Sequence, residues 1–154
     1  MDFELSIIIG RTPNDVFAFF RDKDRHRQKT GSPVLGIEKL DPGPPVPGTR
    51  YREVVQMLPL VRGEIRSRIT RIEPGLWLEE DFEGAAMRGH LAYQFLDVGN
   101  GTRLIQHESL AAQGLLKVLE PIIRRMLFRR LLDRLEGIKR LLENQVSDNI
   151  SFPP

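Results

Sequence analysis

The sequence predicts a single α+β domain in which one antiparallel sheet packs against a long C-terminal helix. In residues 115–143, apolar residues recur every three or four positions for about five turns, which is typical of a helix that buries one side. Between residues 34 and 111, short alternating segments are separated by turn residues, a pattern that predicts consecutive antiparallel strands. A long helix that follows a run of hairpins needs a curved sheet to lie against, and the pair can enclose a cavity.

The composition excludes several classes of protein. A chain of 154 residues with 40% hydrophobic and 29% charged residues is long enough for one packed core, and its balance argues against disorder. The net charge of +2 is too small to indicate a nucleic-acid partner, and the lack of cysteine excludes disulfides and thiol nucleophiles. Because no signal peptide and no membrane-spanning apolar run are visible, we expect a cytoplasmic protein.

The first predicted elements are a strand and a short helix. Residues 3–9 alternate in the manner of a strand with one buried face. Thr12 is a good N-cap and Pro13 suits the first helical position, so a helix should begin there. The polar segment 21–28 and the Gly-Ser-Pro sequence that follows it keep this helix short.

Further strands are expected wherever alternation is bounded by turn residues. The Pro- and Gly-rich residues 41–48 form a loop, and Gly99-Asn100-Gly101 predicts a hairpin because Asn-Gly tolerates positive φ. The predicted strands are 34–40, 51–58, 62–72, 76–82, 89–98 and 102–111.

The C-terminal helix is predicted to have two unequal halves. Its apolar stripe consists of Ile123, Leu127, Leu131, Leu135, Ile138 and Leu142. The first half carries apolar residues on a second side as well, at Leu115, Leu119, Ile122 and Met126. Pro121 lacks a backbone donor and favours a kink or a new helix start. We therefore expect the first half to face both the pocket and something else, such as a loop, a lid or a second subunit.

Several short motifs, taken in order, resemble one known superfamily. They are Arg11–Phe17 (RTPNDVF), Gly101–Leu104 (GTRL), Leu119–Pro121 (LEP) and Leu135–Glu143 (LEGIKRLLE). In this order and spacing they resemble the START-like superfamily, also called the helix-grip, Bet v 1-like or SRPBCC fold, and in particular its polyketide cyclase/dehydrase-like group. The resemblance covers nearly the whole chain, except that segment 21–28 lacks the tryptophan and proline often found there.

The resemblance implies a curved seven-stranded antiparallel sheet around a long C-terminal helix, with one or two short helices after the first strand. Residues 1–146 would form one START-like ligand-binding domain, and residues 147–154 a C-terminal tail. Members of the group bind or transport hydrophobic molecules, and some cyclise or dehydrate polyketides. No catalytic site is shared by the group, so whether this chain is an enzyme stays open.

The expected cavity wall combines apolar residues with a few polar ones. Strand alternation and the helix stripe predict the following ligand-binding residues: Tyr51, Glu53, Met57, Leu78, Glu80, Phe82, Tyr93, Phe95, Gln106, Glu108, Leu119, Ile123 and Met126. Arg66 joins them, with Arg68, if these side chains point inward to pair with the carboxylates. In the alternative interpretation the strand register slips at a bulge and the carboxylates face water, while Tyr93 is a core tyrosine.

Three functions are compatible with this wall. The leading hypothesis is binding or transport of a small hydrophobic molecule, with Tyr93, Glu53, Gln106 and Glu108 orienting its polar end. The second is a polyketide cyclase or dehydratase, in which Glu53 or Glu108 would be a general base with a pKa raised by burial. The third is an adaptor at a membrane surface or on a partner protein, acting through the basic helix.

Residues 117–140 hold eight of the 23 Lys and Arg residues. A solvated, salt-bridged face explains this excess, and docking on an anionic membrane is the functional alternative. Neither a metal-ligand spacing nor a serine nucleophile motif occurs, so we expect no metal and no cofactor. The expected partner is a small hydrophobic ligand rather than nucleic acid, and the protein is expected to be a monomer or a homodimer.

Overall fold

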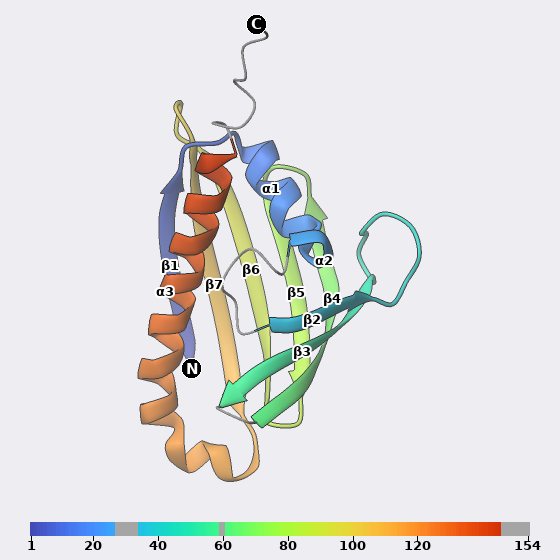
Figure 1. Ribbon diagram of the computed structural model, residues 1–154, viewed down its shortest axis with the longest axis vertical. Helices are drawn as coiled ribbons and strands as arrows, with labels where there is room; N and C mark the ends of the chain where they lie inside the picture. Colours follow the sequence, from blue (N-terminus) through green and yellow to red (C-terminus); the bar gives the residue numbers. More distant parts are fainter. Residues whose placement is uncertain (27–33, 59–60, 146–154) are drawn as a thin grey trace, which may run out of the picture.

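The computed structural model describes residues 1–26, 34–58 and 61–145 and confirms the predicted α+β architecture (Figure 1). A seven-stranded antiparallel sheet has the strand order β1-β7-β6-β5-β4-β3-β2. The strands are β1 (Asp2–Ile9), β2 (Val34–Lys39), β3 (Arg50–Leu58), β4 (Val61–Glu73), β5 (Trp77–Gly84), β6 (Met87–Asp97) and β7 (Thr102–Ala112). The helices are α1 (Pro13–Arg21), α2 (Lys23–His26), the 3-10 helix η2 (Gly114–Leu119) and α3 (Glu120–Asn144). The predicted tail 147–154 lies outside the described residues.

All helices pack on one face of the sheet, which curves around them. Figure 1 shows α3 running along β1 and β7, with α1 and α2 beside its C-terminal end and β2 and β3 bending across the front. α3 packs on β1, and α1 packs on β5 and β6. The start of α3 and the preceding η2 lie at the opposite end of the molecule, at the bottom of this view.

The start of α1 follows the expected local chemistry. Thr12 is in an extended conformation, and its hydroxyl accepts a hydrogen bond from the Asp15 amide at 3.2 Å. Pro13 stands in the first turn, where the lack of a backbone donor costs nothing. The apolar side of α1 is buried, so this cap fixes a helix that closes one end of the sheet.

The packed core gathers at that end. The Phe17 ring meets the Phe95 ring edge-on at 5.6 Å, and the Phe20 ring lies 4.4 Å from the Tyr93 ring. The buried residues of α3 are Leu135, Ile138 and Leu142. All of them belong to the second half of the helix, so the first half leaves its side of the sheet unfilled.

The N-terminal boundary of the long helix differs from the prediction. The α-helix begins at Glu120 rather than at residue 115, because residues 114–119 form the 3-10 helix η2. Pro121 stands in the first turn of α3, as expected for a residue that starts a helix afresh. Within the described ranges, no helix is both long and apolar enough to span a bilayer.

Candidate functional site

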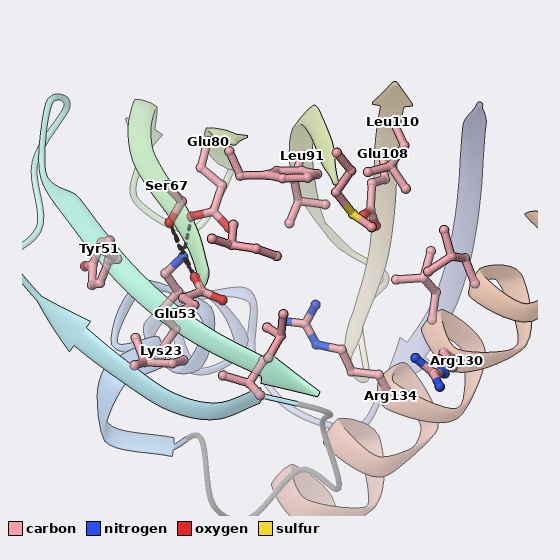
Figure 2. A pocket seen from close by; sticks show the side chains of 18 of the residues that line it. Lys23, Tyr51, Glu53, Ser67, Glu80, Leu91, Glu108, Leu110, Arg130 and Arg134 are labelled. Carbon is pink, nitrogen blue, oxygen red and sulfur yellow. Dashed lines mark hydrogen bonds and ion pairs between the residues drawn. The ribbon is translucent and has the colours of Figure 1, made fainter. Parts of the chain in front are cut away.

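A cavity of about 640 Å³ lies between the concave face of the sheet and α3 (Figure 2). The sheet supplies one wall, the first half of α3 supplies the other, and α1 and α2 close one end. The predicted residues in its wall are Tyr51, Glu53, Leu78, Glu80, Phe82, Tyr93, Glu108, Leu119, Ile123 and Met126. The wall is mostly apolar, and its polar atoms are concentrated in two groups.

Four predicted residues are not part of this wall. The prediction that Arg66 lines the cavity is wrong. Its side chain is 78% exposed and forms a salt bridge with Glu64, whereas the neighbouring Ser67 points into the cavity from β4. Phe95 is only 1% exposed and belongs to the packed core. Gln106 is wholly buried opposite Tyr93 and does not line the cavity, and the side chain of Met57 lies outside the described residues.

The first polar group is centred on Lys23, which α2 projects across the sheet. Its ammonium donates to Glu53 Oε1 and to Glu80 Oε2, each at 2.6 Å, and to Ser67 Oγ at 3.0 Å. The Tyr51 ring lies 4.6 Å from Lys23 Nζ, close enough for a cation–π contact. The carboxylates therefore face inward, and their partner comes from α2 rather than from Arg66.

The charges of Lys23, Glu53 and Glu80 stabilise one another in the ionised form. Burial alone would favour a neutral amine, but the carboxylates of Glu80 and Glu53 raise the pKa of Lys23. Burial would also raise the pKa of Glu53, but the Lys23 ammonium outweighs it and lowers that pKa below the ordinary value. Burial raises the pKa of the Tyr51 hydroxyl to about 12.

The second polar group contains Arg134, Glu108 and Tyr93. Gln106 Nε2 donates to Glu108 Oε2 at 2.8 Å, which fixes the carboxyl against β7. Burial raises the pKa of Glu108, and the nearby Arg134 guanidinium offsets only part of that effect. Burial also raises the pKa of Tyr93 to about 12. Among the described residues, the hydroxyls of Tyr93 and Tyr51 and the Gln106 Oε1 are buried without a hydrogen-bond partner.

The general-base hypothesis requires a carboxylate with a raised pKa. Glu108 meets this requirement, because burial raises its pKa and no cation among the described residues contacts it. Glu53 does not meet it, because Lys23 stabilises its charged form. The two candidates that the sequence left equivalent are therefore chemically different.

Sequence reasoning missed Lys23 and Arg134. Lys23 lies in a polar segment that gives no sign of burial, and only the contact between α2 and the sheet reveals its role. Arg134 is one of the basic helix residues for which the sequence favours a solvated face. It follows Leu131 by three residues and precedes Ile138 by four, so helical spacing alone places it on the apolar stripe.

Several charged residues of the outer sheet face form ordinary surface pairs. Asp81 accepts from His90 at 2.7 Å, and Arg71 pairs with Glu79 at 3.1 Å while stacking on Trp77. In the part of the chain that the structure covers, no group of His, Asp and Glu side chains could hold a metal ion. The cavity beneath α3, with its two buried polar groups, is the candidate site.

A curved antiparallel sheet that grips a C-terminal helix over an internal cavity defines the helix-grip, or START-like, class of protein. The sequence profile of the polyketide cyclase/dehydrase and lipid transport family matches residues 1–143. The chain belongs to this family. No curated protein matches it in sequence.

Solved structures with the same fold share little sequence with this chain. An aromatase/cyclase, ZhuI from Streptomyces sp. R1128, superposes with a TM-score of 0.81 at 11% identity, over 95% of each chain. The protein TTHA0849 from Thermus thermophilus has a TM-score of 0.76 at 16% identity, over 92% of this chain and 97% of its own. The di-domain aromatase/cyclase StfQ of steffimycin biosynthesis has a TM-score of 0.77 at 13% sequence identity, over 95% of this chain and 51% of its own. These similarities establish the fold alone.

Proposed function

We propose that this protein is a cytoplasmic binding protein for a small hydrophobic molecule, which it holds between the sheet and the first half of α3. The observation that carries the proposal is the cavity itself, because about 640 Å³ of the interior is left unfilled by side chains. Ligand sites typically have volumes of about 300–1,000 Å³ and mostly apolar walls. The family's description, which names polyketide and lipid chemistry, is consistent with such a ligand.

Burial of apolar ligand surface would drive binding. At roughly 25 cal/mol per Å², burial of about 500 Å² of apolar surface gains on the order of 12 kcal/mol, which leaves about 8 kcal/mol after an association cost of about 4 kcal/mol. We therefore expect affinities in the low-micromolar range. The two polar groups would orient the ligand rather than supply most of this free energy.

Titration with the neutral fluorescent probe N-phenyl-1-naphthylamine tests the proposal. We expect saturable binding, and competition by members of a lipid and polyphenol panel. Met126→Trp, which fills the cavity from α3, should weaken probe binding by at least about tenfold, whereas Leu132→Trp on the exposed side of the same helix should not. No saturable binding by the wild type would refute the proposal.

Glu108 favours a second candidate function, a cyclase or dehydratase of polyketide-like substrates. A buried carboxyl with a raised pKa can act as a base near neutral pH, and the unpartnered Tyr93 hydroxyl can donate to a carbonyl as charge develops. The test adds the protein to a minimal polyketide synthase and compares products by chromatography. Loss of the new product in Glu108→Gln, with binding retained, would support an enzyme; an unchanged product pattern would not.

The start of α3 favours a third candidate, contact with an anionic membrane. Val118 is 80% exposed and Ile122 is 71% exposed, and Lys117 and Arg125 are exposed beside them. Leu119 and Ile122 also line the cavity, so a ligand could enter from the bilayer here. Co-sedimentation with phosphatidylglycerol vesicles at low salt should be reduced by Val118→Ser with Ile122→Ser, and retained by the control Leu76→Ser. No pelleting of the wild type would dismiss this candidate.

A further inference from the structure

Arg134 places a guanidinium inside the cavity, where no described side chain makes a hydrogen bond or ion pair with it. It projects from α3 into the hollow between helix and sheet (Figure 2). Glu108, Glu53 and Glu80 act on it electrostatically. Lys23, by contrast, is held by two carboxylates and a hydroxyl. A guanidinium enclosed by apolar walls is costly unless an acceptor joins it.

The Tyr93 hydroxyl, near Arg134, also lacks a hydrogen-bond acceptor among the described residues. It keeps its proton because burial raises its pKa to about 12. The Glu108 carboxyl accepts a hydrogen bond from the Gln106 side chain at 2.8 Å and makes none to Arg134 or Tyr93. This part of the cavity therefore presents hydrogen-bond donors, and a complementary ligand must bring acceptor oxygens.

The charges are arranged so that an anion belongs on the helix wall. Arg130 lies one turn before Arg134 on α3 and lines the same wall (Figure 2). The carboxylates of Glu53 and Glu80 stand across the cavity on the sheet, where Lys23 already occupies them. A ligand carboxylate on the helix wall would match the planar guanidinium with two parallel hydrogen bonds.

We propose that Arg134 binds the carboxylate of an otherwise apolar ligand, with the Tyr93 hydroxyl as a second donor. This inference rests on the proposed ligand binding and narrows the ligand from a hydrophobic molecule to an apolar acid. A fatty acid and an aromatic acid carry the same carboxylate chemistry, and a cavity of about 640 Å³ admits either. The test therefore includes one fatty acid and one aromatic acid.

The experiment compares acids with their methyl esters as competitors of N-phenyl-1-naphthylamine at pH 8. Dodecanoic acid and 2-naphthoic acid represent the two classes of acid, and each ester removes the charge while keeping the apolar body. We expect at least one acid to bind about tenfold more tightly than its ester. In Arg134→Met this preference should disappear through weaker binding of the acid, with ester and probe binding retained.

The control is Arg140→Gln, which changes an arginine on the same helix that pairs with Glu136 and is 73% exposed. This variant should keep the wild-type preference for the acid. Arg134→Lys keeps the charge without the planar fork and should retain part of the preference, which gives a second readout if Arg134→Met does not fold.

The outcomes separate this inference from the proposed function. If the probe does not bind the wild type, the proposed function itself fails. If the probe binds but acids and esters compete equally, or if neither competes, the assignment of Arg134 is overturned. An equal loss of acid and ester binding in Arg134→Met also overturns it, because that result indicates a general packing defect.

Discussion

At the scale of single residues, Lys23 has the largest predicted effect on stability. Its ammonium neutralises Glu53 and Glu80, and the three side chains are only 13–16% exposed. Lys23→Met would leave two carboxylates inside the sheet without their cation. We expect a loss of about 3 kcal/mol, at the low end for breaking a buried ion pair, and a melting temperature lower by roughly 6–12 °C.

Thermal and urea unfolding, followed by circular dichroism, measure this loss. Adding Glu53→Gln and Glu80→Gln to Lys23→Met should recover much of the stability, because the uncompensated charges are then gone. Lys117→Met, on an exposed side chain, is the control and should change the unfolding free energy by less than about 0.5 kcal/mol. A loss as small as the control's in Lys23→Met would contradict the buried-pair interpretation.

Glu108 should make stability depend on pH in a defined direction. Because burial raises its pKa, the folded-state pKa lies above the ordinary value of 4.5. Below pH 4.5 the carboxyl is protonated in both states, and above its folded-state pKa the ionised group costs stability. Glu108→Gln should therefore raise the melting temperature more at pH 8 than at about pH 4.5. Glu136→Gln, on an exposed glutamate, should lack this pH dependence.

The sequence correctly predicted side-chain orientation where it depends on alternation along a strand. It did not predict orientation where it depends on packing against an element distant in the sequence. Glu53 and Glu80 face inward because their strand parity places them there. Arg66 does not pair with them, because side chains alternate along β4: Ser67 points into the cavity, so the adjacent Arg66 points outward. Lys23 could not be found from its own segment, since its burial depends on how α2 meets the sheet.

At the scale of elements, α3 divides into a packed half and a cavity half. Leu135, Ile138 and Leu142 are buried against the sheet, whereas Ile122 is exposed and Ile123 lines the cavity. The broader apolar arc of the first half was visible in the sequence. That a loop, a lid or a second subunit covers its exposed side stays a prediction. The 3-10 start of this half was not visible, because short apolar runs do not distinguish helix types.

The join between β1 and β7 depends on Gly101. A Cβ added at this position would collide with the backbone carbonyl of Ile9, the last residue of the paired strand. Gly101→Ala should therefore force the two strands apart and lower the unfolding free energy by about 2 kcal/mol. Gly10→Ala is the matched control, because its Cβ would meet only the flexible Glu143 side chain at 3.4 Å. Equal stabilities of the two variants by urea unfolding would contradict this argument.

At the scale of the whole molecule, the sequence predicted the fold better than the cavity. The order of strands and helices depends on periodicity and turn residues such as Gly99, which has the positive φ of 90° that its hairpin needs. The shape of the cavity depends instead on register shifts and on tertiary contacts. β3 shifts register between Gln56 and Leu58, and Gln56 lines the cavity beside Val55. Alternation alone cannot place such a bulge.

The molecule is packed at one end and hollow at the other, so a larger side chain should affect its stability differently at the two ends. Met126 lines the cavity, so Met126→Trp can place its ring in empty space and should keep or raise the melting temperature. Leu135 is 2% exposed within the core, so Leu135→Trp must displace its neighbours and should cost about 1–3 kcal/mol. Both variants are read by calorimetry without ligand, which separates this test from binding. An equal loss of stability in both would mean that the space beneath α3 is not available to a side chain, and a ligand of similar size would then have no room either.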